Sequence, residues 1–223
     1  MAVKIYSYKA DKNKALSAHF KVKEFRCKDG SDKILINSTL IDVLEKLFDK
    51  LGCDTMNIQS GYRTNEYSKK VGGYAGDQHT QGNAADIWCK KNGKKMDAKD
   101  ICCALEELNH QGGVGYISKT NVHVDVRGKK VWFDETKNER TTESWYKYFG
   151  ITRPGDKPKA VKHKVTCLST WIRKANAKGG LLEIYMRGKI VEVVGTSGRY
   201  SKIIYGKKGL EYAYIPTEYI KKV

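Results

Sequence analysis

The sequence predicts an α+β domain, a small and mostly antiparallel sheet with packed helices, followed by a small β-barrel. Up to about residue 150, segments with helical periodicity alternate with short strand-like segments, whereas the remainder contains short strands, glycine-containing turns and no helical period. Between these parts, the segment 151–163 holds two of the three prolines and little apolar material. We therefore expect a first domain over residues 1–150, a linker over 151–163 and a second domain over 164–223.

The clearest predicted helix lies in NSTLIDVLEKLFDKLG, residues 37–52. Asn37 or Ser38 caps its first turn, and Gly52 supplies the stop. Its apolar face repeats at helical spacing and consists of Leu40, Val43, Leu44, Leu47, Phe48 and Leu51. Two more helices are predicted, one in TNEYSKKVGG after Thr64 and one in MDAKDICCALEELNHQGG with Asp97 as its cap.

Short strands are predicted around these helices, in the segments MNIQSGY, AADIW, VGYI, NVHVDV and KVWF. The second domain contributes LLEIYMRGKIVEVVG, YSKIIYG and EYAYIP. Helices packed on a small sheet define an α+β domain, whereas consecutive short strands with glycine turns are typical of a small barrel.

The charge of the chain calls for a polyanionic partner. Its 223 residues carry a formal net charge of +17 at pH 7, and after residue 150 there are 16 Lys and Arg residues against 5 Asp and Glu residues. Nucleic acid, an acidic membrane surface and the phosphate-bearing polymers of a bacterial wall all qualify. With 40% hydrophobic and 30% charged residues, the composition is that of a globular protein with an ordinary core and excludes a disordered chain.

The six cysteines form no CxxC pair, and two of them are adjacent in a helical pattern, so we expect reduced thiols in a chain made in a cytosol. The N-terminal segment MAVKIYSYKADKNKA has no apolar region typical of a secretory signal. No run of residues approaches the ~18–20 apolar residues that a membrane-spanning helix needs.

A possible metal site lies in GDQHTQGNAADIW, where His79 and Asp86 are seven residues apart. A catalytic zinc ion takes three protein ligands and leaves one position for water. Strand alternation turns Asp86 away from its apolar neighbours in AADIW, and in NVHVDV it places His123 and Asp125 on one face. A His, Asp and His set would result if these strands are adjacent. From the residues alone, a chance pairing in a polar loop remains the alternative.

Three ordered blocks, SGYRTNEYSKKVGG, DQHTQGNAADI and NVHVDVRG, resemble the zinc peptidases that cut peptidoglycan stem peptides. That family includes D-alanyl-D-alanine carboxypeptidases and the L-alanyl-D-glutamate endopeptidases of phage endolysins. The upstream SAHFKVKEFRCKDG is similar to the segment that opens this domain in the carboxypeptidase-like branch, so the resemblance extends from Ser17 to about Phe133.

The resemblance implies that one Zn²⁺ ion is held by three ligands, His79, Asp86 and His123. It also implies that Arg63 points into the cleft, where its planar guanidinium would bind the developing oxyanion or a substrate carboxylate. A surface ion pair with Glu66 is the alternative for this arginine. Gln78, beside the first ligand, is assigned to substrate binding.

The general base is where the sequence departs from the family pattern. Several members carry a Glu or Asp three residues before the last histidine ligand, and here that position is Thr120, which cannot take a proton. Asp125 is the nearest acid and becomes the candidate base. The alternative for Asp125 is a carboxylate that orients a metal ligand.

The second domain resembles the bacterial SH3-type wall-binding modules, through WIRKANAKGGLLEIYMRGKIVEVVG and through YSKIIYG followed by YAYIPTEYI. The expected fold is therefore a small SH3-like β-barrel. Trp171, Tyr200 and Tyr214, together with Tyr185 and Tyr212, are candidates for a shallow peptide-binding groove. Packing in the barrel core is the alternative for each of them.

Together these features predict an endolysin-type zinc metallopeptidase that hydrolyses peptide bonds in peptidoglycan stem peptides or cross-links and lyses the cell. Its expected partners are peptidoglycan and anionic wall polymers of a Gram-positive host, and neither nucleic acid nor a membrane. We expect a monomer, made in the host cytoplasm without a signal peptide and then released to the wall. A non-catalytic wall-binding protein on the same scaffold and a basic nucleic-acid-binding protein are the alternatives. The sequence does not indicate which bond is cut.

Overall fold

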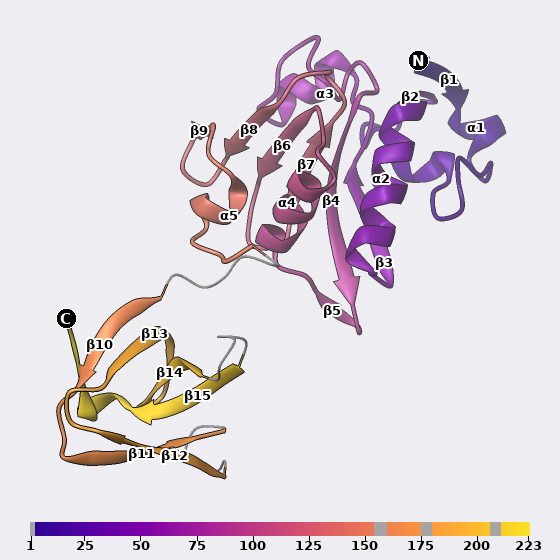
Figure 1. Cartoon of the computed structure of the whole chain (residues 1–223). Coiled ribbons are helices and arrows are strands. Elements are labelled where there is room, and N and C mark those ends of the chain that lie inside the picture. The colour runs from indigo at the N-terminus through magenta and orange to yellow at the C-terminus, as the bar shows by residue number, and fades with distance from the viewer. Residues whose placement is uncertain (1–2, 154–159, 175–179, 206–210) are drawn as a thin grey trace. The chain divides into compact units, whose positions relative to one another are not determined.

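The chain divides into two compact units, Met1–Ile151 and Thr152–Val223, in a computed structural model (Figure 1). The structure describes residues 3–153, 160–174, 180–205 and 211–223. Each unit has its own hydrophobic core, and each is described separately here.

The first unit is built on a mostly antiparallel sheet. Only the pair β6–β8 is parallel, and β5 adds to the edge of β4. In sheet order the strands are β3 (Thr55–Ser60), β4 (Ala84–Lys91), β7 (Val122–Asp125), β6 (Gly113–Tyr116), β8 (Val131–Asp134) and β9 (Glu139–Thr141), with β5 at Lys94–Lys95. A separate antiparallel pair joins β1 (Val3–Ser7) to β2 (Lys33–Asn37).

Helices α2 and α4 pack on one face of this sheet (Figure 1). The helices of the unit are α1 (Tyr8–Asp11), α2 (Ser38–Leu51), α3 (Asn65–Lys70), α4 (Ala98–Glu107) and α5 (Trp145–Tyr148), with a 3₁₀ turn at Val22–Phe25. Helix α2 begins where the Asn37 side chain accepts a hydrogen bond from the Thr39 amide, and it ends at Gly52 in the left-handed conformation, φ +55°.

The packing of α2 differs slightly from its predicted apolar face. Leu40, Leu44, Leu47 and Leu51 are buried as expected, whereas Val43 and Phe48 are only partly buried at the edge of the core. Ile41, which the prediction omitted, is buried in their place. Each strand contributes alternate residues to this core, so the opposite face of the sheet remains free for polar groups.

The second unit is a seven-stranded antiparallel sheet with a small core. Its strand order is β12 (Leu181–Met186), β11 (Ser169–Arg173), β15 (Glu211–Pro216), β14 (Tyr200–Tyr205), β13 (Ile190–Ser197), β10 (Val161–Val165) and β16 (Ile220–Lys222), with a 3₁₀ turn at Thr217–Tyr219. Its core consists of Val165, Ile172, Tyr185, Val191, Ile203, Ala213 and Ile215.

The predicted α+β class is confirmed, with several sheets and few helices. The SH3-like barrel is not confirmed, because in the described part of the second unit β12 and β16 end an open path and do not pair with each other. Strand β10 begins at Val161, inside the segment predicted as a linker, and residues 154–159 of that segment lie outside the described residues. All six cysteines are free thiols. Within the described ranges, no helix combines the length and the apolar character needed to span a membrane.

Candidate metal centre

Asp86 and His123 meet on the face of the sheet that is turned away from the helices. They are direct cross-strand partners on β4 and β7. Their neighbours Ala85, Ile87 and Val124 are fully buried in the core on the other face. Because side chains alternate along a strand, the apolar residues that pack against the helices place these two polar side chains side by side.

His79 reaches the same point from the loop that precedes β4. Asp77 organises this loop by accepting a hydrogen bond from the Thr80 amide at 2.9 Å, and the His79 carbonyl accepts one from the Gly82 amide at 3.1 Å. Gly82 has a φ of +72°, a conformation that favours glycine. His79 itself is buried, with 4% of its surface exposed.

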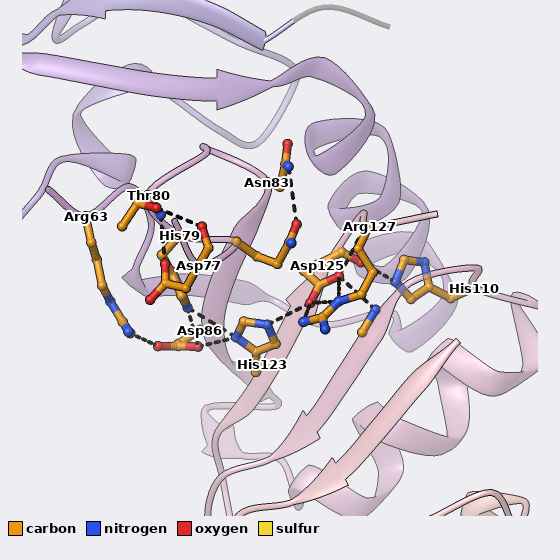
Figure 2. A network of polar contacts seen from close by, with 12 residues as sticks. Arg63, Asp77, His79, Thr80, Asn83, Asp86, His110, His123, Asp125 and Arg127 are labelled. Atoms are coloured by element: carbon orange, nitrogen blue, oxygen red, sulfur yellow. Dashed lines mark hydrogen bonds and ion pairs between the residues drawn. The ribbon is translucent and has the colours of Figure 1, made fainter. Parts of the chain in front are cut away.

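Hydrogen bonds orient both histidine rings, and Figure 2 shows the one between His123 and Asp125. His79 Nδ1 lies 2.8 Å from the Gly61 carbonyl, which can only accept, so Nδ1 carries the proton and Nε2 keeps its lone pair. His123 Nε2 lies 3.1 Å from a carboxylate oxygen of Asp125 and donates to it, so Nδ1 is the nitrogen that faces Asp86. His79 Nε2 and His123 Nδ1 are therefore the two ring nitrogens that a metal ion beside Asp86 would bind.

The three ligand atoms have the spacing of a metal site. His79 Nε2 lies 3.2 Å from His123 Nδ1, and these two nitrogens lie 3.3 Å and 2.9 Å from Asp86 Oδ1. Atoms bound to a tetrahedral zinc ion at about 2.1 Å lie roughly 3.4 Å from one another. Two imidazoles and a carboxylate are a donor set that zinc accepts, so the residues fit this ion.

The charges in this group depend on one another. Burial raises the pKa of Asp86, but hydrogen bonds with His123 and His79 outweigh it and hold the pKa well below its usual range. Burial lowers the pKa of His123, but the hydrogen bonds with Asp125 and Asp86 outweigh it and raise the pKa to about 9. The metal-free group therefore pairs an anionic Asp86 with a protonated His123 ring, and a metal ion would have to displace that proton.

Asp125 lies on the far side of the His123 ring from Asp86 and is fully buried (Figure 2). One oxygen accepts a hydrogen bond from the Gly113 amide at 2.9 Å, and both accept from the Arg127 guanidinium, Nε lying 2.9 Å and 2.8 Å away. Burial raises its pKa, but His123 and Arg127 hold the pKa well below its usual range. In this position Asp125 orients His123, and its oxygens are already occupied.

Arg63 lines the cleft, as the resemblance implied, and its ion-pair partner is Asp86 and not Glu66. Its Nε also donates to the Ser60 hydroxyl at 2.9 Å. Both partners are on adjacent strands, because Ser60 pairs with Asp86 across β3 and β4. The guanidinium is thus held at the edge of the ligand group.

The ligand group opens into a cleft of about 680 Å³. Besides the three ligands, its walls include Gln78, a predicted substrate-binding residue, and the aromatic rings of Tyr74 and Phe133. Three arginines, Arg63, Arg127 and Arg140, also line it. Such a cleft can hold an anionic peptide beside the metal group.

Sequence reasoning missed four charged residues in this cleft, which are Asp77, Arg127, Glu135 and Arg140. For Glu135, alternation in VWFDE was the available signal, because Trp132 and Asp134 are buried whereas Val131, Phe133 and Glu135 line the cleft. Thr120 does not line the cleft, and its hydroxyl donates to the Asn121 side chain at 2.9 Å.

In the second unit, the predicted wall-binding residues share the outer face of the sheet. Tyr200 and Tyr214 alternate with the core residues of β14 and β15, and Tyr214 is the cross-strand partner of Arg173 on β11. Trp171 lies on the same side of β11 and is 44% exposed. Tyr185 is 8% exposed and packs in the core, so it cannot line a groove there.

Residues 17–125 match the family model described as Peptidase M15. This match supports the predicted resemblance to the M15 zinc peptidase family. No curated protein and no solved structure matches the chain. The matched segment includes all three candidate ligands, Arg63 and Asp125, and it ends ten residues before Glu135. Peptidases of this family are zinc-dependent, in agreement with the donor set.

Proposed function

We propose that this chain is a zinc peptidase of the endolysin type, which hydrolyses peptide bonds in peptidoglycan stem peptides or cross-links. The observation that carries the proposal is the group formed by His79, Asp86 and His123, whose potential ligand atoms converge at the wall of an open cleft. The match to Peptidase M15 supports the reaction class.

The three ligands would hold a single zinc ion, which when bound supplies a Lewis acid that activates water and polarises the scissile carbonyl. The residues of the chain prepare the site for this chemistry. Asp125 fixes the ring of His123, and the Gly61 carbonyl fixes that of His79. Arg63 presents its remaining N–H groups to the oxyanion that develops in the transition state.

The charge of the cleft favours an acidic peptide. Stem peptides of peptidoglycan carry free carboxylates, and three arginines line the cleft. Arg140 has no ion-pair partner within the described part of the chain, so its guanidinium is available to a substrate carboxylate. Gln78 adds an amide for hydrogen bonds to the peptide backbone.

The second unit would hold the enzyme on the wall. Its outer face combines Trp171, Tyr200 and Tyr214 with basic side chains, and Lys202 lies 4.0 Å above the Tyr212 ring. Aromatic and cationic groups on one face suit a polymer that carries both sugar or peptide surfaces and phosphates. This face is consistent with attachment to a Gram-positive wall. We further propose a monomer that is made in the host cytoplasm and released to lyse the cell.

The test is a turbidity assay on purified Gram-positive walls, with mass spectrometry of the released fragments. We expect the chain to contain one zinc ion and to clear the walls. Clearing should stop when a chelator is added and resume when zinc is restored. His123→Ala removes a ligand and is expected to abolish both zinc binding and clearing. Full activity of that variant would refute the proposal, and retention on walls without any hydrolysis would instead indicate a non-catalytic wall-binding protein.

A further inference from the structure

A row of cross-strand partners runs across six strands of the sheet, on the face that carries the cleft. Ser60, Asp86, His123, Gly115, Phe133 and Arg140 are successive cross-strand partners on β3, β4, β7, β6, β8 and β9. Gly115 is the one member of this row without a side chain. The row is therefore open directly beside His123.

The carboxylate of Glu135 lies over this opening. A Cβ placed on Gly115 would be 3.0 Å from His123 Cβ and 3.3 Å from Glu135 Oε1, so both atoms border the same small space. Glu135 follows β8, on the same side as Val131 and Phe133, and its backbone is held by a 3.0 Å hydrogen bond from its amide to the Tyr116 carbonyl. The missing side chain of Gly115 thus gives the carboxylate its access to the metal group.

The carboxylate of Glu135 is also available to accept a proton. Within the described ranges its carboxylate has no hydrogen-bond or ion-pair partner, and it lines the cleft. Burial raises its pKa, and Asp86 acts in the same direction, while His123, Arg63 and His79 act against them. Arg127 and Arg140 line the same cleft as Glu135.

Neither Asp125, the predicted base, nor Thr120, at the position of the base in the family pattern, can take this role. The oxygens of Asp125 are occupied by the Gly113 amide and Arg127, on the far side of the His123 ring. Thr120 has no acidic group, and its hydroxyl is turned to Asn121. A base must lie within reach of the proton that it removes, and both oxygens of Glu135 remain available for that contact.

We propose that Glu135 is the general base and acid of this active site, in place of the carboxylate that the family pattern puts at Thr120. This inference rests on the proposed peptidase function. Glu135 takes a proton from the attacking water as the water oxygen bonds to the peptide carbonyl carbon. It then gives that proton to the amide nitrogen as the C–N bond breaks, which yields a carboxylic acid and an amine and restores the carboxylate.

The test compares Glu135→Gln with the full-length wild type, on soluble stem peptides and at saturating zinc. We expect kcat/KM to fall by about 10²–10⁴ in this variant because the proton acceptor is lost. One zinc ion per chain should remain bound, since Glu135 is not a ligand. Glu143→Gln is the matched control, because Glu143 is a surface acid paired with Lys147 and does not line the cleft.

A second measurement does not depend on turnover. With cobalt in place of zinc, the visible spectrum reports protonation beside the ion, and its pH midpoint should shift in Glu135→Gln and not in Glu143→Gln. Wild-type hydrolysis by Glu135→Gln, or loss of its bound zinc, would overturn the inference while the peptidase function stands. If the wild type itself cleaves no stem peptide, the function fails, and an unshifted cobalt midpoint would then overturn the place of Glu135 beside the ion.

Discussion

The imidazole of His123 lies between two carboxylates, and this position ties metal binding to pH. Hydrogen bonds with Asp125 and Asp86 overcome the effect of burial and raise its pKa to about 9. In the metal-free chain, the protonated ring therefore contributes stability that is complete below its unfolded pKa of about 6.5. That contribution is lost as the pH rises through about 9.

A metal ion needs the lone pair on His123 Nδ1, so it must displace this proton. We expect zinc binding at pH 7 to release about one proton, and the apparent affinity to weaken about tenfold for each unit of pH below the His123 pKa. Calorimetric titrations in two buffers with different ionisation enthalpies measure the proton count. A heat of binding that is independent of the buffer would contradict the prediction.

Asp125 gives a second prediction for a single residue. In Asp125→Asn the hydrogen bond that orients His123 is weakened and Arg127 loses its charged partner, so zinc affinity should fall about 10–100-fold. At saturating zinc the rate should stay within severalfold of the wild type, because the oxygens of Asp125 do not face the cleft. A rate that collapses at saturating zinc would make Asp125 the base.

The control for this variant is Asp134→Asn. Asp134 is also a buried acid, 2% exposed, but it accepts hydrogen bonds from Thr136 and Tyr148 on the other face of β8. Its replacement should lower the free energy of unfolding and leave zinc affinity unchanged. The comparison separates the orientation of a ligand from the general cost of altering a buried carboxylate.

At the scale of elements, the loop before β4 places His79 and leads into the strand that carries Asp86. A Cβ on Gly82 would lie 2.6 Å from the Leu35 carbonyl carbon and oxygen, and the φ of +72° adds strain for any side chain. We expect Gly82→Ala to lower the free energy of unfolding by about 1–3 kcal/mol and to weaken zinc binding, because the backbone must move. Chemical denaturation and zinc titration measure the two effects.

Gly76→Ala is the matched control for the loop. Gly76 has a φ of +80°, but nothing lies within 4 Å of the position of its Cβ. It should therefore show only the conformational cost, about 1–2 kcal/mol, with zinc affinity unchanged. Equal effects of the two substitutions on zinc binding would show that contact between Gly82 and Leu35 does not position the ligands.

Local patterns predicted the part of the site that depends on alternation. The apolar residues of AADIW and NVHVDV place Asp86 and His123 on one face, and this follows from a period of two that burial enforces. The positions of Glu135 and Arg140 beside the ligands depend on the parallel pairing of β6 with β8 and on the pairing of β8 with β9. No local pattern specifies which strands pair. Asp125 shares the face of His123 as predicted, but Arg127 and Gly113 determine which way its oxygens point.

At the scale of the whole molecule, each of the two units has its own role in the proposed function. The first holds the candidate metal centre, and the second carries 16 Lys and Arg residues against 5 Asp and Glu residues in residues 151–223. If the second unit attaches the enzyme to anionic wall polymers, that attachment must depend on salt, because long-range attraction is screened over about 10 Å at 0.1 M ionic strength.

We therefore expect retention of the full chain on purified walls to fall steeply as ionic strength rises from about 0.05 to about 0.5 M. The kcat on soluble stem peptides should change little, because at saturation the rate does not depend on encounter. Trp171→Ala should weaken retention further at every salt concentration, since its side chain is exposed on the outer face of β11. The control is Leu168→Ala, because Leu168 is also exposed. Ile172→Ala would not serve, because Ile172 is buried in the core. Retention that resists salt and is the same in wild type and Trp171→Ala would place wall attachment outside this face, and the high charge of the second unit would then need another partner.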